Sequence, residues 1–166
     1  MSTFTGTTMT TPASAFSIVI DDGGTIVAAG FCPMGDLADR LHDDVETIDD
    51  LGPASRAMER YFAGELTAFD ELAVRQPGTA HQQAVWKALR DVPAGTTVTY
   101  GELTARLGLP PGASRAVGSA CGANLVAPIV PCHRVVRAGG GLGGYYYGLP
   151  TKRWLLDHES GTTSLL

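Results

Sequence analysis

The sequence predicts a protein of mixed α/β (α+β) class in two parts, a small α/β unit followed by a mainly helical unit with a helix-turn-helix. Two apolar runs flank the turn sequence Asp21-Asp22-Gly23-Gly24, which predicts a β-hairpin near the N-terminus. In the second half, two short helical segments flank a Gly- and Pro-containing turn at 108–112, the pattern of a helix-turn-helix.

Charge divides the chain in the same way. Residues 1–83 hold 4 Lys/Arg and 13 Asp/Glu, whereas residues 84–166 hold 8 Lys/Arg and 4 Asp/Glu. An acidic half joined to a basic half is expected when one part of a protein meets a polyanion. Acidic residues that only keep the first half in solution explain the same pattern.

Composition excludes several classes of protein. Of the 166 residues, 44% are hydrophobic, and no apolar run reaches the roughly 18 residues of a membrane-spanning helix. The threonine-rich stretch 1–14 lacks the regions of a secretory signal, so we expect a disordered leader there. The cysteines, 3 in number, are widely spaced, which favours thiols in a reducing cytoplasm over a disulfide framework.

The first domain is expected over residues 15–76. It should hold the hairpin strands at 16–20 and 25–31, a short helix at 37–41, and a helix at 53–62 that begins at a proline and ends near Gly64. The second helix has one apolar face, made of Ala54, Ala57, Met58, Tyr61 and Phe62. Cys32 and His42 are too few to make a structural zinc site, and we expect no metal.

A linker, Gln76-Pro77-Gly78, leads to the second domain at 79–166. Its expected elements are a helix at 80–90, a strand at 96–99, helices at 100–107 and 113–123, a glycine-rich loop at 139–148 and a closing helix at 150–159. The apolar stripe of its first helix consists of Ala84, Val85, Ala88 and Leu89, with Trp86 as a packing residue.

The predicted helix 113–123 is built almost entirely of small residues, and Arg115 is its one long side chain. Such a helix approaches a DNA groove closely without reading base sequence. Alternatively, the small residues serve tight helix packing, and Arg115 pairs with an acid. The sequence leaves both interpretations open.

Pro131-Cys132-His133 places a thiol beside an imidazole within a stiff, apolar stretch. A nucleophilic cysteine acts as thiolate, which a nearby histidine favours. Neighbours in a regular strand point to opposite faces, so either the backbone turns sharply here or the contact passes through water. The alternative is a buried core cysteine beside an unrelated histidine.

Together, the motifs of the second half resemble those of the O6-alkylguanine-DNA alkyltransferases, also called methylated-DNA–protein-cysteine methyltransferases. The matching pieces, in the family's order, are Gln82-x-x-Val85-Trp86, Thr99-Tyr100-Gly101-Glu102-Leu103, Ser114-Arg115-Ala116-Val117-Gly118, Asn124, Pro131-Cys132-His133-Arg134-Val135-Val136, Gly144-Tyr145 and Trp154-Leu155-Leu156-Asp157-His158-Glu159. The chain departs from the family pattern at His81, Leu125, Tyr146 and Tyr147.

The resemblance implies a ribonuclease-H-like sheet in the first domain and a winged-helix-like second domain that carries the active site. It implies DNA repair by direct reversal: irreversible transfer of the alkyl group from O6-alkylguanine, and from O4-alkylthymine, to Cys132. The partner would be double-stranded DNA with a flipped-out base. The protein would need no cofactor, would not bind membranes and would act as a monomer. Because the product thioether is a poor leaving group, we expect one transfer per molecule.

The resemblance also assigns roles to residues. Glu159 would orient His133 and favour its protonated form, and His133 would take the proton of Cys132 through water. Tyr100 would donate a proton toward the departing base, and Asn124 would brace the turn at the active site. Substrate-binding residues would be Tyr145, Tyr146, Tyr147, Val135 and Lys152. DNA-binding residues would be Arg115, Ser114, Ala116 and Arg137.

Two other functions compete with this interpretation. One is an alkylated-DNA-binding protein with weak or no transfer, which Tyr147 and Leu125 would favour, although such proteins lack the cysteine. The other is a thiol hydrolase. The sequence shows no identifiable oxyanion-hole element, which argues against that function.

Overall fold

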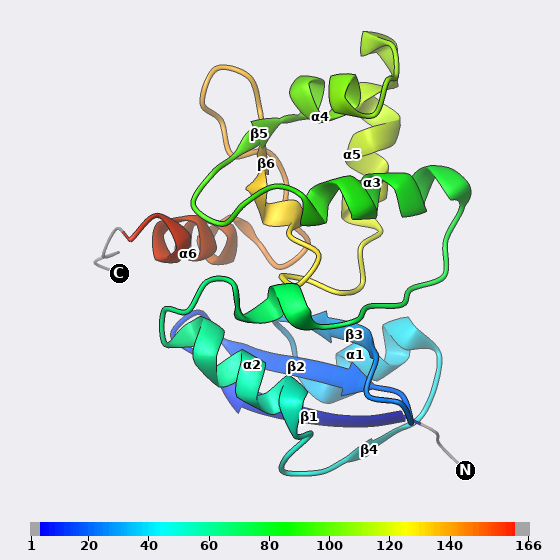
Figure 1. Ribbon diagram of the computed structural model, residues 1–166, viewed down its shortest axis with the longest axis vertical. Helices are drawn as coiled ribbons and strands as arrows, with labels where there is room; N and C mark the ends of the chain where they lie inside the picture. Colours follow the sequence, from blue (N-terminus) through cyan, green and yellow to red (C-terminus); the bar gives the residue numbers. More distant parts are fainter. Residues whose placement is uncertain (1–3, 162–166) are drawn as a thin grey trace. The chain divides into compact units, whose positions relative to one another are not determined.

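The computed structural model describes residues 4–161 (Figure 1). The chain forms two compact units. The first contains the chain up to Gln76 together with Leu125–Ile129, and the second contains Pro77–Asn124 and the chain from Val130 onward.

The first unit is built on a four-stranded sheet in the order β3-β2-β1-β4. Its strands are β1 (Phe4–Thr10), β2 (Ala15–Ile20), β3 (Ile26–Gly30) and β4 (Val45–Thr47). Antiparallel pairing of β2 with β3 confirms the predicted hairpin, and β4 runs parallel to β1. Asp21 closes the hairpin turn, because its Oδ1 accepts hydrogen bonds from the backbone N–H groups of Gly23 and Thr25.

The prediction of a disordered leader at 1–14 is wrong for the residues that the structure describes. β1 pairs with β2 from Thr5 opposite Ile20 to Thr10 opposite Ala15. Threonine is β-branched and suits a strand, so a polar composition here supports sheet pairing instead of disorder. Residues 1–3 lie outside the described residues.

The domain boundaries also differ from the prediction, because Leu125–Ile129 belongs to the first unit. This segment lies beside β3: Ala29 N–H donates to Leu125 O at 2.9 Å, and Ala127 N–H donates to Ala29 O at 3.1 Å. The side chain of Gln76, predicted as a linker residue, is buried and accepts a hydrogen bond from Leu125 N–H at 3.0 Å. These backbone groups find partners far away in the sequence, which no local pattern reveals.

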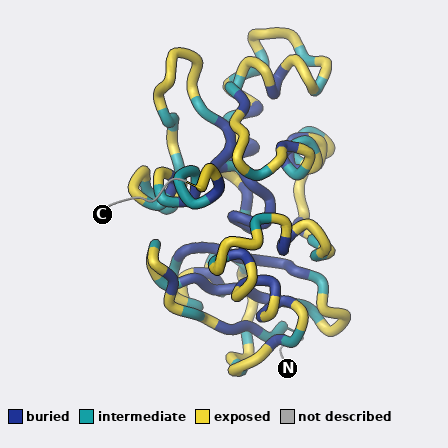
Figure 2. Tube along the Cα trace, turned by 60° about the vertical axis from the view of Figure 1, so that its left-hand side comes forward, coloured by how far each residue is buried: buried dark blue, intermediate teal, exposed yellow. Residues whose placement is uncertain are grey.

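Two helices cover the sheet, α1 (Met34–Leu41) and α2 (Pro53–Phe62). Val19 of β2 packs in a cluster with Leu37 of α1, whereas Phe16 of the same strand contacts the ring of Phe62 at 5.4 Å. Because odd and even strand positions point to opposite faces, α1 and α2 cover opposite faces of the sheet (Figure 1). A 3₁₀ turn, Ala68–Glu71, follows, and its Phe69 stacks on Tyr61 at 4.5 Å. Most residues of β2 and β3 are buried, and Figure 2 shows such buried segments in dark blue.

The second unit contains α3 (Ala80–Arg90), α4 (Tyr100–Arg106), α5 (Ser114–Gly122) and α6 (Leu149–Ser160). A 3₁₀ turn, Pro111–Ala113, lies between α4 and α5 in the predicted helix-turn-helix. Two short strands, β5 (Val98–Thr99) and β6 (Val135–Val136), pair in parallel. All four predicted helices are present, each within about two residues of its expected ends.

Helix α3 packs on α5 through a face that differs from the predicted stripe. Val85, Trp86 and Leu89 are buried, whereas Ala84 is exposed. Trp86 acts as the expected packing residue, and its Nε1–H donates to Ala120 O at 2.9 Å. The predicted stripe is therefore right at Val85 and Leu89 and wrong at Ala84, and Trp86 belongs to the buried face.

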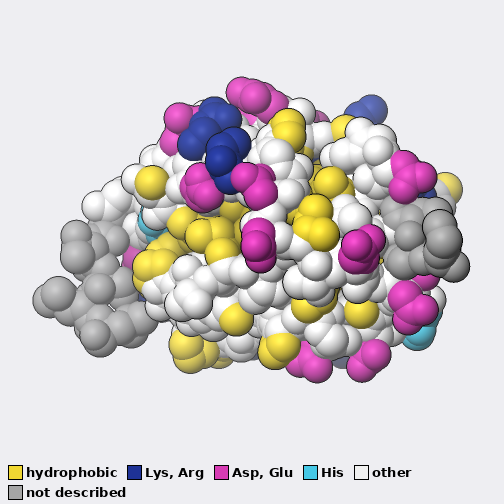
Figure 3. Space-filling model, turned by 90° about the horizontal axis from the view of Figure 1, so that it is seen from below, with side chains coloured by type: hydrophobic (Ala, Val, Ile, Leu, Met, Phe, Trp, Pro, Cys, Tyr) yellow, Lys and Arg dark blue, Asp and Glu magenta, His cyan; other side chains and the backbone are white. Residues whose placement is uncertain are grey.

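In the part of the chain that the structure describes, every helix is too short or too polar to cross a membrane. The face drawn in Figure 3 carries many separate acidic side chains and few basic ones.

The capping box of α3 leads to a stability prediction. Thr79 Oγ1 accepts a hydrogen bond from Gln82 N–H at 3.1 Å, and Gln82 Oε1 accepts one from Thr79 N–H at 2.9 Å. Thr79→Ala should lower the free energy of unfolding of the second unit by about 1 kcal/mol. Urea unfolding followed by tryptophan fluorescence measures this, because Trp86 and Trp154 both belong to that unit.

Thr67→Ala is the matched control, since Thr67 precedes a 3₁₀ turn without a side-chain cap. An equal loss of stability in both variants would contradict the assignment to capping.

Candidate active site

Cys132 begins a single 3₁₀ turn, Cys132–Arg134, directly before β6. Cys132 N–H donates to Val130 O at 2.9 Å, and Arg134 N–H donates to Pro131 O at 3.1 Å. The backbone therefore turns sharply at the thiol, one of the two arrangements that the sequence left open. Cys132 is partly exposed, whereas His133 is buried.

Asn124 holds the start of this turn. Its buried Nδ2 donates to Val130 O at 2.8 Å and to Cys132 Sγ at 3.5 Å. The first bond fixes the backbone two residues before the thiol, and the second offers a donor to a thiolate. A hydrogen bond to the charged form of a group favours that form.

Glu159 of α6 joins His133 and Arg134. Glu159 Oε2 lies 2.9 Å from His133 Nε2, and Arg134 donates from Nε to Oε1 and from Nη2 to Oε2, both at 2.9 Å. The remaining Arg134 nitrogen, Nη1, donates to Val92 O at 2.6 Å. The carboxylate is thus shared between an imidazole and a guanidinium inside the protein.

Sequence reasoning missed Arg134. The sequence did hold a signal for this ion pair: an arginine directly after His133 in the apolar motif, and the acid Glu159 in the closing helix. The partner of Arg134 lies 25 residues away, so local spacing did not reveal the pair.

The charges of this cluster set its protonation. Burial alone raises the pKa of Glu159, but His133 and Arg134 bring it well below its ordinary value, so the carboxylate stays ionised. Burial lowers the pKa of His133, and the opposing effect of Glu159 does not restore it. Glu159 raises the pKa of His133, as expected, but burial of the ring and the charges of Arg134 and Lys152 outweigh the carboxylate, so the pKa stays below its ordinary value.

A neutral His133 has one ring nitrogen left for chemistry. Nε2 faces Glu159, while Nδ1 is buried and has no hydrogen-bond partner among residues 4–161. A neutral imidazole can accept a proton.

Tyr100, the first residue of α4, is fixed by its surroundings. Thr99 caps the helix in a capping box with Glu102. One edge of the Tyr100 ring faces Gly118 of α5, and the other faces Gly143 of the glycine-rich loop. Burial raises the pKa of Tyr100, so its hydroxyl keeps its proton at neutral pH.

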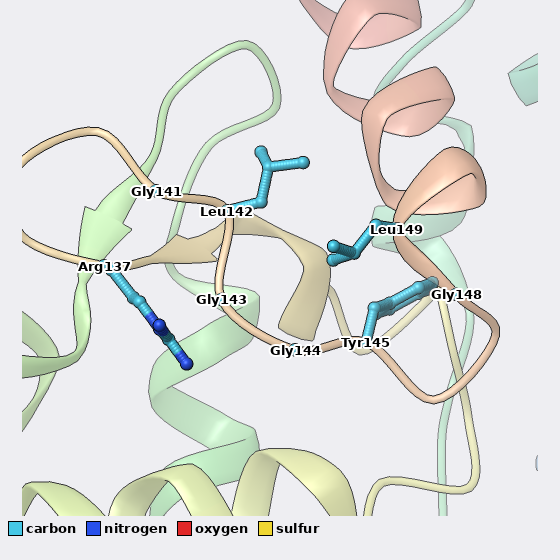
Figure 4. Close-up of a pocket in the computed structure, with 8 residues that line it drawn as sticks. All are labelled: Arg137, Gly141, Leu142, Gly143, Gly144, Tyr145, Gly148 and Leu149. Atoms are coloured by element: carbon cyan, nitrogen blue, oxygen red, sulfur yellow. The ribbon is translucent and has the colours of Figure 1, made fainter.

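The glycine-rich loop and α6 border a cavity of about 510 Å³ (Figure 4). Tyr145 lines this cavity, together with Arg137, Gly141, Leu142, Gly143, Gly144, Gly148 and Leu149. Tyr146, at 61% exposure, does not line it. Tyr147 contacts the rings of both other tyrosines, at 5.8 Å from Tyr145 and 5.0 Å from Tyr146.

Lys152 and Val135 support the loop. Lys152 is fully buried, and its Nζ donates to Val135 O at 2.7 Å and to Gly144 O at 3.2 Å. Burial lowers the pKa of Lys152, although the thiols of Cys132 and Cys121 oppose this. The lysine therefore connects β6 to the loop that carries Tyr145.

The predicted DNA-binding residues fall in two places. Ser114, Arg115 and Ala116 form the first turn of α5, with Arg115 and Ala116 exposed. Within the described chain, no acid lies at ion-pair distance from Arg115, which contradicts the alternative of a structural ion pair. Arg137 lies apart from this turn, beside the cavity.

The two other cysteines and the remaining histidines form no further site. Burial raises the pKa of Cys121 to about 12, so this thiol is not a nucleophile at neutral pH. Among the described residues, no three His, Cys, Asp or Glu side chains are grouped as metal ligands. His81, found where the family has phenylalanine, has its Nε2 3.1 Å from Ala116 O.

Comparison with known proteins identifies the family. Residues 80–161 match the model of the 6-O-methylguanine DNA methyltransferase DNA-binding domain. The methylated-DNA–protein-cysteine methyltransferase of Salmonella typhimurium is 40% identical over 157 residues, covering 90% of this chain and 91% of the relative. The chain belongs to this methyltransferase family.

Other family members agree. The methylated-DNA–protein-cysteine methyltransferase of Mycobacterium tuberculosis is 54% identical over 114 residues, covering 66% of this chain and 67% of the relative. The structure of Mycobacterium tuberculosis OGT in complex with DNA superimposes with a TM-score of 0.82 at 38% identity, covering 94% of this chain and 92% of that one. The methyltransferase of Pyrococcus kodakaraensis gives a TM-score of 0.69 at 26% identity, covering 94% and 98%. The mixed α/β fold with a DNA-binding second part, as predicted, is that of this methyltransferase family.

Burial of His133 predicts a pH dependence of stability. Its folded pKa lies below the ordinary value of 6.5, so the unfolded chain binds more protons as the pH falls through 6.5. Stability should therefore be full above pH 6.5 and fall toward pH 5, by at most about 1.4 kcal/mol per pH unit from this one group. The loss from Glu159 starts lower, below its ordinary value of 4.5.

Urea unfolding of the second unit at several pH values measures this slope. His133→Gln should flatten it between pH 7 and 5, whereas His81→Gln, which changes a partly exposed ring, should leave it in place. An unchanged slope in His133→Gln would refute the prediction.

Proposed function

We propose that this protein repairs DNA by moving the alkyl group of O6-alkylguanine, and of O4-alkylthymine, onto Cys132. The observation that carries the proposal is a partly exposed thiol bonded by Asn124 and adjoining the buried His133–Glu159 pair. The names of its relatives, methylated-DNA–protein-cysteine methyltransferases, support the same reaction.

Proton removal from the thiol comes first. Glu159 holds His133 through Nε2, and Arg134 holds Glu159 in its ionised form. His133 is thereby fixed as a neutral base whose Nδ1 takes the proton of Cys132 through a water molecule. Asn124 then stabilises the thiolate with its Nδ2–H.

Transfer follows in one displacement. The Cys132 sulfur forms a bond to the alkyl carbon, the bond from that carbon to guanine O6 breaks, and its electron pair passes to the base. Tyr100, kept protonated by burial, gives its proton toward the departing base. The thioether that results is stable, and no second nucleophile removes the alkyl group, so each molecule acts once.

DNA reaches the site through the second unit. This unit contains 8 Lys/Arg and 4 Asp/Glu, which favours a polyanion. A paired base must leave the helix to reach Cys132, at a cost of a few kcal/mol. Arg115, exposed on the first turn of α5 with Ser114 and Ala116 beside it, would enter the groove and offset this cost.

The flipped base would be held by the loop and β6. Tyr145 offers a ring at the cavity, and Val135 and Lys152 form its support. We assign Tyr146 and Tyr147 to the outer edge of this pocket. The protein would act as a monomer on double-stranded DNA in the reducing cytoplasm, where Cys132 stays a thiol.

Intact-protein mass spectrometry tests the reaction directly. After incubation with a duplex that carries O6-methylguanine, the protein should gain one methyl group, about 14 Da, at Cys132 as expected for a thioether. Cys132→Ala should gain nothing. Cys121→Ala should still gain the methyl group, because Cys121 is a buried thiol with a raised pKa.

Lesion binding without any mass gain would instead establish a damage-binding protein. A shift that hydroxylamine reverses would indicate acyl chemistry.

We expect the ring of Tyr147 to limit the size of the alkyl groups that the protein accepts. This ring packs edge-on against both neighbouring tyrosines and is partly buried. Tyr147→Ala should raise the rate for O6-benzylguanine relative to O6-methylguanine in the same duplex, by roughly tenfold, because it enlarges the pocket edge. Single-turnover rates for both lesions measure the ratio.

Tyr147→Phe keeps the ring and should keep the wild-type ratio. If Tyr147→Ala slows both lesions equally, the ring supports the loop instead of limiting the substrate.

A further inference from the structure

Arg137 is held against the glycine-rich loop. Its backbone N–H donates to Gly141 O at 2.9 Å, which closes the turn after β6. Its side-chain Cδ and Cβ lie 3.6 and 3.7 Å from the position that a Cβ at Gly141 would take. Although the residue is exposed, its stem therefore lies along the loop beside the cavity that Tyr145 lines (Figure 4).

Gly143 brings Arg137 close to Tyr100. A Cβ at Gly143 would lie 3.1 Å from both Cε2 and the hydroxyl oxygen of Tyr100, and 3.6 Å from Arg137 Cγ. Gly143 also has a φ of +74°, which suits glycine. The hydroxyl edge of Tyr100 and the stem of Arg137 therefore both lie next to the space that a side chain at Gly143 would fill.

The charge of Arg137 opposes the other influences on Tyr100. Burial raises the pKa of Tyr100, and the thiols of Cys121 and Cys132 raise it further, whereas Arg137 lowers it. A proton donor becomes anionic as it acts, and a nearby cation stabilises that anion. DNA bound over the site would exclude the water that screens the guanidinium, which strengthens this effect.

We propose that Arg137 is a positioning residue for alkyl transfer, whose guanidinium stabilises the Tyr100 phenolate formed when Tyr100 protonates the departing base. The inference rests on the proposed function. The electron pair of the broken carbon–O6 bond stays on guanine, and the Tyr100 proton neutralises it. The phenolate regains the proton that Cys132 gave to His133, so the transfer neither consumes nor releases a proton overall.

A double-mutant cycle tests this role. Single-turnover methyl transfer is measured at saturating duplex for wild type, Arg137→Gln, Tyr100→Phe and the double variant, with duplex affinity measured separately. Arg137→Gln should slow the saturated rate about tenfold, a part of what a general acid contributes. In the Tyr100→Phe background the same change should have no effect. Arg137→Lys, which keeps the charge, should restore most of the rate.

Arg153→Gln is the matched control, because it removes one exposed arginine from α6 and should leave the saturated rate unchanged. Thermal unfolding shows whether each variant is folded, and Arg137→Met and Arg137→Lys form a second charge-only comparison if Arg137→Gln is not.

Several outcomes would overturn the inference. Arg137→Gln that weakens duplex binding at an unchanged saturated rate would make Arg137 a phosphate contact only. Equal slowing by Arg137→Gln with and without the Tyr100 hydroxyl would show that Arg137 does not act through Tyr100. A Tyr100→Phe variant as fast as wild type would show that Tyr100 donates no proton, which also overturns the inference. Failure of the proposed function itself is separate, since it appears as wild-type protein without methyl on Cys132.

Discussion

The candidate active site depends on the hydrogen bonds and ion pairs of the Glu159 carboxylate. This carboxylate is buried, and it binds His133 and Arg134 of the turn that begins at the thiol. Arg134 extends the network to Val92 O. A buried charge without its partner is strongly destabilising, so the carboxylate and guanidinium require each other. Because His133 and Arg134 directly follow Cys132, this pairing fixes the position of the turn that carries the sulfur and the tautomer of the His133 imidazole.

Local chemistry explains which elements could be predicted from the sequence. Helix α2 begins at Pro53 as expected, because proline suits the first turn, and α3 follows the cap formed by Thr79. Strand β1 was missed because its threonine-rich sequence becomes a strand only by pairing with β2. The place of Leu125–Ile129 in the first unit depends likewise on partners distant in the chain.

In the candidate site, too, the sequence indicated the residues but not their environment in the fold. Motif resemblance brought together Cys132, His133 and Glu159, and the structure places the histidine and glutamate 2.9 Å apart. The effect of Glu159 on His133 was predicted in the right direction, but the net pKa of His133 is lowered, because the sequence shows the acid and not the complete burial of the ring. Tyr146 was assigned to the substrate-binding residues from its position in the tyrosine run, and its 61% exposure, which the sequence does not reveal, leaves it only the outer edge of the pocket.

Leu125–Ile129 belongs to the first unit, although the chain on both sides of it belongs to the second, and this has a consequence for biosynthesis. Asn124 and Val130 flank this segment, and Asn124 Nδ2 donates to Val130 O at 2.8 Å. Cys132 follows Val130 by two residues. A ribosome releases the chain from its N-terminus, and domains ordinarily fold in that order. Here the first unit lacks its last five residues until Ile129 has left the ribosome. The first unit is therefore complete only shortly before Cys132 emerges, which couples folding of this unit to the arrival of that cysteine.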